Sequence, residues 1–383
     1  MGQFQHSRRL LFLAAPSMAL LDVVAELLFT LRKRHPDLRL SALFLDKKNA
    51  NQVDPTDTVG SFAASLFDDF MLFENNRITN YPSLVAMHRR QFRSLKAVTH
   101  RRHVHTFQRF DAVVLDPSYE SSPKFQSLLP LIPGSAPFFY FEHGVIPTPP
   151  NSRIPVLLGD RVRTIYVPYR NNDLNDFSAV APNATVKAVG LLRTHRSYTT
   201  RVKERSRWLH KDPPPNSALV IARPMPIDAL REVLSTLHES LWVRRGIPLV
   251  IRAHPKSAGK GKGGDIRCAL PAELEGRSWM VSRGHPLHLA EGAKLAITFF
   301  SNLCFDLVQC GVPVIEYPST NNSLYHKFVS PASSSAELET EIDFALRGES
   351  LGPLSAAVDA FIVDPPDLET VVSDLSAALF GNA

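Results

Sequence analysis

Cysteine is scarce in this sequence, which has three in 383 residues. Cys268, Cys304 and Cys310 show no spacing typical of metal ligands, and an odd, sparse set does not build a disulfide framework. Aspartate and histidine form no compact metal-binding cluster in the sequence either. We therefore expect a protein of a reducing compartment that works without a metal ion or another cofactor.

Long apolar runs are also absent, since none reaches the roughly 18–20 residues that a membrane span needs. The best candidate, Ala15–Arg34, is interrupted by Asp22 and Glu26 and predicts an amphipathic helix. The preceding residues Arg8–Pro16 predict a strand, and no cleavage-like site of a signal peptide follows. We expect a cytoplasmic protein.

The sequence has no repeat at a fixed period. Its glycine-lysine segment "AGKGKGGD" (258–265) lacks the GxxxxGK[ST] order of a phosphate-binding loop, so we interpret it as a surface loop.

Basic residues exceed acidic ones by six, and the pI of about 9.2 indicates acidic partners. The segment His88–Arg109 contains seven Lys/Arg, four His and no carboxylate. It predicts either a solvated helix face or contact with an anionic acceptor or membrane surface, which would place the protein peripherally at the inner membrane face. Nucleic acid is not expected as a partner, because no nucleic-acid-binding module accompanies the segment.

Apolar segments of strand length alternate with helical patterns along most of the chain. Strands are expected at Arg9–Ala14, Leu38–Leu45, Ala112–Leu115, Phe138–Phe141, Thr164–Val167, Val186–Val189, Ala218–Ala222, Leu249–Ala253, Trp279–Val281, Leu295–Phe299 and Val312–Tyr317. Helices are expected at Ala19–Lys33, Asp57–Phe67, Pro82–Thr106, Ile227–Arg244, Pro286–Glu291, Leu303–Cys310, Ala336–Leu346 and Leu368–Leu379. This alternation predicts an α/β fold with two doubly wound, Rossmann-like domains that face a cleft.

The polar, basic segment Arg193–Ser217 contains three consecutive prolines and is the best domain boundary. It predicts an acceptor domain at 1–200 and a nucleotide-donor domain at 201–350. The C-terminal helices at 351–383 are expected to pack back on the first domain.

In the second predicted domain, polar residues follow two strands. The segment "VIRAHPK" places Arg252 and His254 at the end of one strand, and Ser301 and Asn302 follow the strand "LAITFF". Ligands of open parallel sheets bind at the carboxyl ends of the strands, and Ser301 is expected to cap a helix whose N-terminus favours a phosphate. Each residue alone fits a structural role, but together they predict an anion site.

Two carboxylates nearby are candidates for binding a ribose. Asp306 lies about one turn into the helix that follows Ser301, where a surface aspartate is the alternative interpretation. Glu316 ends the strand in "CGVPVIEYPS".

The first predicted domain supplies the candidates for a catalytic base. Strand Phe138–Phe141 ends at Glu142, His143 and Gly144, and the glycine would let the backbone turn closely around a ligand. His143 is the preferred base, because an imidazole titrates near pH 6.5. Asp116 in "VVLDPSYESS" is its rival, and Glu142 is a further candidate.

The "HG" and "HP" motifs and the later "SNLCFD…CGVPVIE" resemble those of two-domain GT-B glycosyltransferases. More narrowly, they resemble bacterial capsule, lipopolysaccharide and teichoic-acid enzymes with cytidine-activated donors, namely Kdo and sialic acid transferases and CDP-glycerol glycerophosphotransferases. The resemblance implies that His254 and Ser301 bind the donor phosphate and that His143 is functional. It implies transfer of a sugar or polyol phosphate, from a donor that is expected to be CMP-linked, to a cell-surface glycan or glycolipid. Such transfer needs no metal when protein groups stabilise the leaving phosphate.

Two other functions fit the same fold. One is a nonhydrolysing sugar-nucleotide 2-epimerase, and the other is a carbohydrate-binding protein without turnover. The reaction products distinguish all three.

Overall fold

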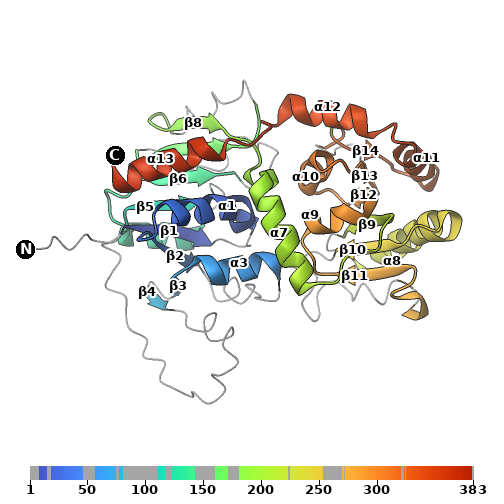
Figure 1. The fold of residues 1–383 in the computed structure, drawn as a ribbon, viewed down its shortest axis with the longest axis horizontal. Helices are drawn as coiled ribbons and strands as arrows, with labels where there is room; N and C mark the ends of the chain where they lie inside the picture. The colour runs from blue at the N-terminus through green and yellow to red at the C-terminus, as the bar shows by residue number, and fades with distance from the viewer. Residues whose placement is uncertain are drawn as a thin grey trace, which may run out of the picture. The chain divides into compact units, whose positions relative to one another are not determined.

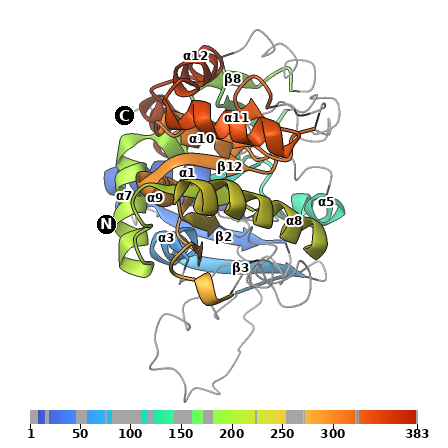
Figure 2. The same cartoon turned by 90° about the vertical axis from the view of Figure 1, so that its right-hand side faces the viewer.

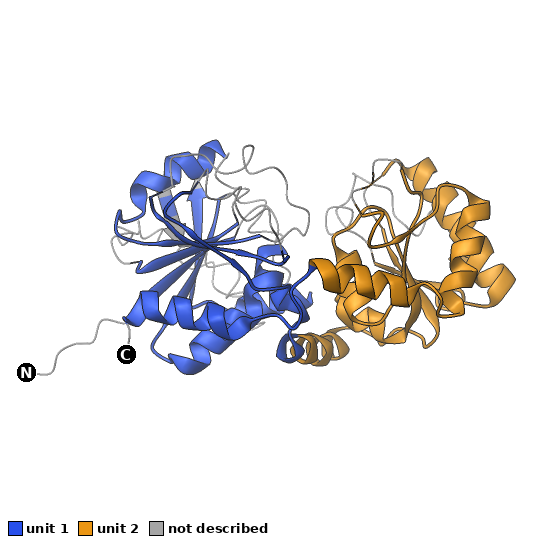
Figure 3. Cartoon of the chain, turned by 90° about the horizontal axis from the view of Figure 1, so that it is seen from above, with its two compact units in different colours: residues 1–198, 362–383 blue, residues 199–361 orange. Residues whose placement is uncertain are grey.

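The computed structural model of the chain describes residues 8–14, 19–45, 57–74, 77–80, 110–116, 122–142, 160–170, 181–222, 225–252, 270, 272–320, 323 and 325–381. The chain divides into two compact units, which Figure 3 colours separately. Unit 1 comprises residues 1–198 and 362–383, and unit 2 comprises residues 199–361.

Unit 1 is built on an eight-stranded sheet in the order β4-β3-β2-β1-β5-β6-β7-β8 (Figure 1). The strands are β1 (Arg9–Ala14), β2 (Arg39–Phe44), β3 (Asp69–Glu74), β4 (Arg77–Asn80), β5 (Ala112–Leu115), β6 (Phe138–Phe141), β7 (Val162–Val167) and β8 (Thr185–Ala188). Neighbouring strands are parallel, except for the antiparallel pair β3–β4. All residues of β5 and β6 are buried, as expected for apolar strands covered on both faces.

The described helices of unit 1 are α1 (Ala19–Arg34), α3 (Thr58–Leu66), α5 (Pro123–Leu128) and α13 (Leu368–Phe380). Helix α1 begins with Asp22 in its first turn and ends with three basic residues, which complements the helix dipole. It packs against α3 and α13. Helix α13 belongs to this unit although it follows unit 2 in the sequence. Its Glu369 forms an ion pair with Arg34, and its Asp374 forms one with Lys187.

Unit 2 contains a six-stranded, all-parallel sheet in the order β11-β10-β9-β12-β13-β14. The strands are β9 (Ser217–Ile221), β10 (Leu249–Arg252), β11 (Trp279–Ser282), β12 (Ala293–Thr298), β13 (Val314–Glu316) and β14 (Ser330–Pro331). From β9 the chain builds outward through β10 and β11, and then crosses to the other side of β9 for β12, β13 and β14. The strand order therefore reverses between β9 and β12.

Helices cover both faces of this sheet. They are α8 (Ile227–Leu237), which continues as a π-helical segment at His238–Val243, α9 (Pro286–Leu289), α10 (Leu303–Gln309), α11 (Ser335–Leu346) and α12 (Leu351–Phe361). Helices α8 and α11, in the foreground of Figure 2, pack apolar side chains at helical spacing into the core against the sheet. Helix α10 packs against α9 and α12.

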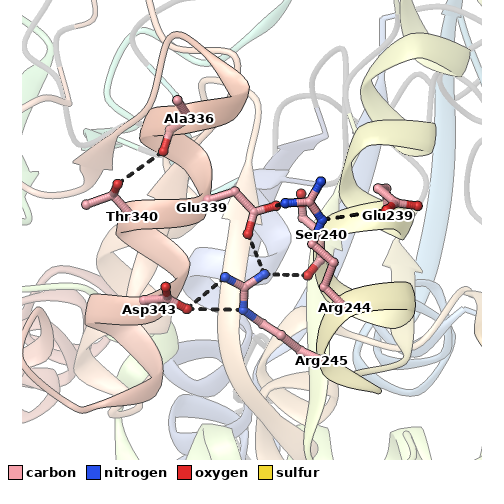
Figure 4. A network of polar contacts seen from close by, with 8 residues as sticks. All are labelled: Glu239, Ser240, Arg244, Arg245, Ala336, Glu339, Thr340 and Asp343. Carbon is pink, nitrogen blue, oxygen red and sulfur yellow. Dashed lines mark hydrogen bonds and ion pairs between the residues drawn. The ribbon is translucent and has the colours of Figure 1, made fainter.

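A polar network joins the end of the π-helical segment to α11 (Figure 4). The Arg245 guanidinium donates to Oδ1 of Asp343 at 2.7 and 3.1 Å, to Oε2 of Glu339 at 2.5 Å and to the Ser240 carbonyl at 2.6 Å. Arg244 lies 3.4 Å from the other oxygen of Glu339. These contacts hold the two helical segments together above the apolar core.

The predicted α/β fold with two doubly wound sheets is confirmed, but some elements differ. The segment 193–217, expected to contain the domain boundary, does contain the division between the units at Tyr198–Thr199, but most of it forms the unpredicted helix α7 (Arg196–Leu209). Helix α7 was not predicted because few of its positions are buried, so its sequence shows almost no apolar residues at helical spacing. Strands β3 and β4 and helix α5 were not predicted, and α12 lies in the range 351–383 where C-terminal helices were expected without individual bounds.

The first unit boundary lies close to the expected position 200, whereas the second differs from the expected position 350. The first lies at Tyr198–Thr199 within α7, and the second at Phe361–Ile362. Helix α12 consequently belongs to unit 2, and only the residues after it return to unit 1. Gly190 permits this return, because it adopts φ +76° and a Cβ there would lie 2.2 Å from the Val363 carbonyl oxygen.

Candidate functional site

The carboxyl edge of the unit 2 sheet brings several predicted site residues together. Ile221 of β9 pairs with Arg252 of β10 on one side and with Thr298 of β12 on the other, and Thr298 pairs with Glu316 of β13. Because all strands are parallel, residues that follow these positions leave the sheet at the same edge. The edge includes the point where the strand order reverses, which is where ligands of doubly wound sheets bind.

Arg252 is the last residue of β10, and its guanidinium is fixed in place. Its Nε donates to the carbonyl of Gly284 at 2.8 Å, in the loop that follows β11. The adjacent His285 is buried and caps α9, with its Nδ1 accepting from the Leu287 amide. The predicted phosphate ligand His254 lies outside the described residues.

The turn between β12 and α10 contains Ser301 and Asn302. Ser301 caps the helix as expected, because Asn302 already has helical backbone angles (φ −58°, ψ −16°) and its side chain makes no capping bond. Ser301 Oγ accepts from the Leu303 amide at 3.3 Å, which is the capping bond. The helix has only seven residues, so its dipole is small.

Sequence reasoning missed two aromatic residues here, Phe300 in this turn and Tyr325 in the loop after β13, which packs on it. Phe300 has φ +60°, in the left-handed region that few residues other than glycine adopt, and it is 40% exposed. Tyr325 packs edge to face on Phe300 with ring centroids 4.8 Å apart, and its hydroxyl donates to Oδ1 of Asn302 at 2.5 Å. The sequence did not indicate an exposed aromatic residue at this position, because two phenylalanines at the end of a strand are typical of a buried core.

Glu316 lies at the same edge, but both of its carboxylate oxygens have partners within the protein. Oε1 accepts from Ser319 Oγ at 2.9 Å, and Oε2 accepts from Ser323 Oγ at 2.8 Å. Ser319 also contacts Nε2 of His326 at 3.0 Å. The side chain is 2% exposed, so Glu316 organises the loop after β13, and its predicted contact with a ribose is untested.

Asp306 is fully buried in α10, in contrast to the alternative of a surface aspartate. The Cys310 amide, one turn further along, donates to the Asp306 carbonyl at 3.0 Å. Asp306 thus lies on the face of α10 that carries Cys310. This placement favours a structural role over contact with a ribose.

In unit 1 the candidate bases follow neighbouring parallel strands. Asp116 follows β5 and Glu142 follows β6, and both are buried. Oε2 of Glu142 accepts from the buried Tyr169 hydroxyl at 2.8 Å, which holds the carboxylate in one orientation. His143 and Gly144 lie outside the described residues, as does the basic segment His88–Arg109.

A cavity of about 1140 Å³ lies at the opposite edge of the unit 1 sheet, where β1, β2 and β3 begin. Its lining includes Arg39, Asp69 and the stacked pair His35 and Phe380. None of the predicted site residues contributes to it.

Within the described part of the chain, no three His, Cys, Asp or Glu side chains gather as a metal site requires. None of the described helices has the length and apolarity needed to cross a membrane.

Neither a protein-family model nor a curated protein sequence matches the chain. Solved structures do match over nearly its full length. Similarity covers 98% of this chain and 98% of S. aureus MnaA in complex with UDP, with a TM-score of 0.60 and 11% identity. It covers 98% of this chain and all of the Neisseria meningitidis UDP-GlcNAc 2-epimerase bound to UDP-GlcNAc, with a TM-score of 0.59 and 12% identity.

A ugt transferase from Siraitia grosvenorii in complex with UDP matches as well. The similarity covers 96% of this chain and 98% of that one, with a TM-score of 0.51 and 14% identity. The chain has a GT-B fold. At these identities the likeness establishes the fold shared by glycosyltransferases and UDP-GlcNAc 2-epimerases.

Proposed function

We propose that this chain is an enzyme acting on a nucleotide sugar, which binds at the carboxyl edge of the unit 2 sheet. The observation that carries the proposal is the convergence of Arg252, the Ser301 turn and Glu316 around the reversal point between β9 and β12. A fixed cation and a turn of polar groups at one edge of a sheet suit an anionic leaving group. Structures of the same fold that contain UDP or UDP-GlcNAc support this choice.

The proposed reaction is transfer of a sugar or polyol phosphate to a hydroxyl of a cell-surface glycan or glycolipid. For a sugar, the bond between its anomeric carbon and the donor phosphate breaks, and a bond to the acceptor oxygen forms. The nucleotide leaves with the electron pair, and its growing charge is stabilised by protonated His254 and Ser301. The acceptor proton passes to a base of unit 1, with His143 preferred and Asp116 and Glu142 as rivals.

The donor nucleotide is proposed to be a cytidine nucleotide, in accordance with the resemblance to Kdo and sialic acid transferases and CDP-glycerol glycerophosphotransferases. Uridine is its direct rival, because the three solved structures above contain UDP or UDP-GlcNAc. Both bases are pyrimidines, so the two versions share one binding site.

A 2-epimerase is the second candidate function. The observation in its favour is the greater similarity to the N. meningitidis epimerase, with a TM-score of 0.59, than to the S. grosvenorii transferase, with 0.51. An epimerase inverts one carbon of the sugar and needs no acceptor.

Product analysis separates these functions. The purified chain is incubated with CMP-sialic acid, CMP-Kdo, CDP-glycerol, UDP-GlcNAc and UDP-glucose, with and without a panel of glycan and lipid-linked acceptors. A transferase releases the nucleotide in proportion to an extended acceptor. Conversion of UDP-GlcNAc to its 2-epimer without an acceptor indicates an epimerase, and nucleotide binding without any product indicates a binding protein.

The segment His88–Arg109 is proposed to hold the protein at an anionic membrane or acceptor. Replacing Arg89, Arg90, Arg101 and Arg102 with Ser should weaken binding to acidic liposomes and reduce its salt dependence. Absence of wild-type binding to acidic liposomes at low salt would contradict the membrane version.

A further inference from the structure

Tyr169 holds the candidate base Glu142 through a hydrogen bond between two buried side chains. The tyrosine hydroxyl donates to Oε2 of Glu142 at 2.8 Å, and the exposed fractions of the two residues are 1% and 6%. The backbone adds a second constraint, because the Glu142 amide donates to the Tyr166 carbonyl at 3.2 Å. A hydrogen bond to a charged group is stronger than one between neutral groups, and more so inside a protein. The bond from Tyr169 therefore restricts the direction of the carboxylate.

The backbone around Tyr169 is held in turn by the return segment, residues 362–364, where the chain comes back from unit 2 to unit 1. Tyr169 forms an antiparallel bridge with Ile362, and the Val363 amide donates to the carbonyl of the residue before Tyr169 at 3.1 Å. On the other side, Arg170 Nε donates to the Ile362 carbonyl at 3.1 Å. A shift of the return segment therefore moves the hydroxyl that bonds to the candidate base.

We propose that Tyr169 is a positioning residue, which couples the orientation of Glu142 to the return segment. The inference rests on the proposed function, in which Glu142 is a candidate base, and it requires that Glu142 acts on the reacting proton. A base works only within hydrogen-bond reach of that proton and in the correct direction. Tyr169 acts through the carboxylate by fixing this direction.

The test measures turnover by the full chain with CMP-sialic acid, CMP-Kdo, CDP-glycerol, UDP-GlcNAc and UDP-glucose, with and without the acceptor panel described above. Tyr169→Phe removes only the hydroxyl. With the donor that the wild type uses best, we expect kcat to fall roughly 10- to 150-fold, as for the loss of a hydrogen bond to a charged group. The KM of the donor should stay within about twofold of the wild type, because the lost bond acts in the transition state.

Tyr166→Phe is the matched control, because it removes another buried tyrosine hydroxyl, in β7. This hydroxyl donates to Oδ2 of Asp374 in α13 at 2.9 Å, so a bond of the same kind is lost without a contact to a candidate base. The thermal unfolding midpoint should fall about as far as in Tyr169→Phe, while kcat stays unchanged. Equal losses of kcat in the two variants would assign the effect to stability and overturn the proposal.

Arg170→Met tests the coupling to the return segment, because it removes the donor to the Ile362 carbonyl. Its kcat should fall roughly 2- to 10-fold, as for the loss of one ordinary hydrogen bond, with an unchanged KM. A kcat equal to that of the wild type would overturn the coupling.

A double-mutant cycle tests whether Tyr169 acts through Glu142. In a Glu142→Gln background, Tyr169→Phe should lower kcat no further, because the carboxylate that it positions is already lost. Multiplicative effects of the two substitutions, or full turnover by Glu142→Gln, would overturn the proposal and leave the proposed function intact, with His143 or Asp116 as the base. If the wild type turns over none of the five donors, the proposed function fails together with this inference.

Discussion

Ser323 Oγ donates a hydrogen bond of 2.8 Å to Oε2 of Glu316, and Ser319 Oγ donates one of 2.9 Å to the other oxygen. All three residues are less than 9% exposed, so water does not replace these bonds easily. Each bond joins the end of β13 to the loop that carries Tyr325. The geometry of the candidate nucleotide site thus depends on a carboxylate that sequence reasoning assigned to a ribose.

Glu316→Ala is expected to lower the free energy of unfolding by about 1.5–3 kcal/mol, because hydroxyl groups bonded to a charged oxygen lose their partner inside the protein. Ser323→Ala, which removes one of the two bonds, should cost about half as much. Urea unfolding of both variants measures this. An unchanged unfolding midpoint of Glu316→Ala, together with lost nucleotide binding, would instead support the ribose role.

The stability of unit 2 should fall as the pH decreases below about 6.5. His288 is fully buried, with Nε2 3.3 Å from Asp212 and Nδ1 3.4 Å from Glu291. Burial lowers its pKa below the ordinary value of 6.5, since it outweighs these two carboxylates, and Arg207 adds to the lowering. Below pH 6.5 the unfolded chain therefore takes up a proton that the folded chain does not, which favours unfolding.

The variant His288→Gln removes this titration and should flatten the decline between pH 7.5 and 5.5. The difference from the wild type is about 1.4 kcal/mol for each unit by which the pKa is lowered. Glu291 does not interfere: burial raises its pKa, but Lys203 and Arg207 bring it below 4.5, outside this range. A wild-type protein that becomes more stable at pH 5.5 would show that His288 is protonated and paired.

Arg245 is expected to be the main polar stabiliser of the contact between the π-helical segment and α11. Its side chain is 17% exposed and bonds to three groups (Figure 4). Arg245→Met should lower the free energy of unfolding by about 1–3 kcal/mol, because Glu339 and Asp343 lose a charged partner. Arg231→Met is the matched control, since its pair with Asp228 is exposed and should contribute less than about 0.5 kcal/mol. Equal effects of the two substitutions would contradict this account.

The two motif histidines should differ in their effects on binding and turnover. His254→Ala should weaken nucleotide binding and lower turnover by roughly 10²–10³, because it removes a donor to the leaving phosphate. His143→Ala should keep near-normal nucleotide affinity and lose roughly 10²–10⁴ in transfer, as expected for a lost general base. His195→Ala is the control, at a histidine whose side chain contacts the nearby Ser197 among the residues that the structure describes. Full transfer by His143→Ala with none by Asp116→Ala would identify Asp116 as the base.

The sequence predicted the sheets well because parallel buried strands are continuous apolar runs, as in β5 and β6, whose bounds match the prediction. Helix α7 was not predicted, because its many basic residues leave few apolar positions at helical spacing. Strands β3 and β4 were not predicted either. At the site, the sequence identified Arg252, Ser301 and Glu316 as strand-end residues. It did not reveal that Glu316 bonds to Ser319 and Ser323, or that Tyr325 supports Phe300, because these contacts depend on how a loop folds back. A single sequence contains no periodic signal for such contacts.

Nucleotide binding tests the central claim most directly. Thermal shifts and then calorimetry with CMP, CDP, UDP, GDP and ADP should show one pyrimidine nucleotide bound per chain. At 100 times its Kd this ligand should stabilise the fold by about 2.7 kcal/mol. The same titration on Ser301→Ala should give a weaker Kd, because the candidate site lies at that turn. Preference for a purine nucleotide would contradict the assignment of the base, and no binding of any nucleotide would contradict the account as a whole.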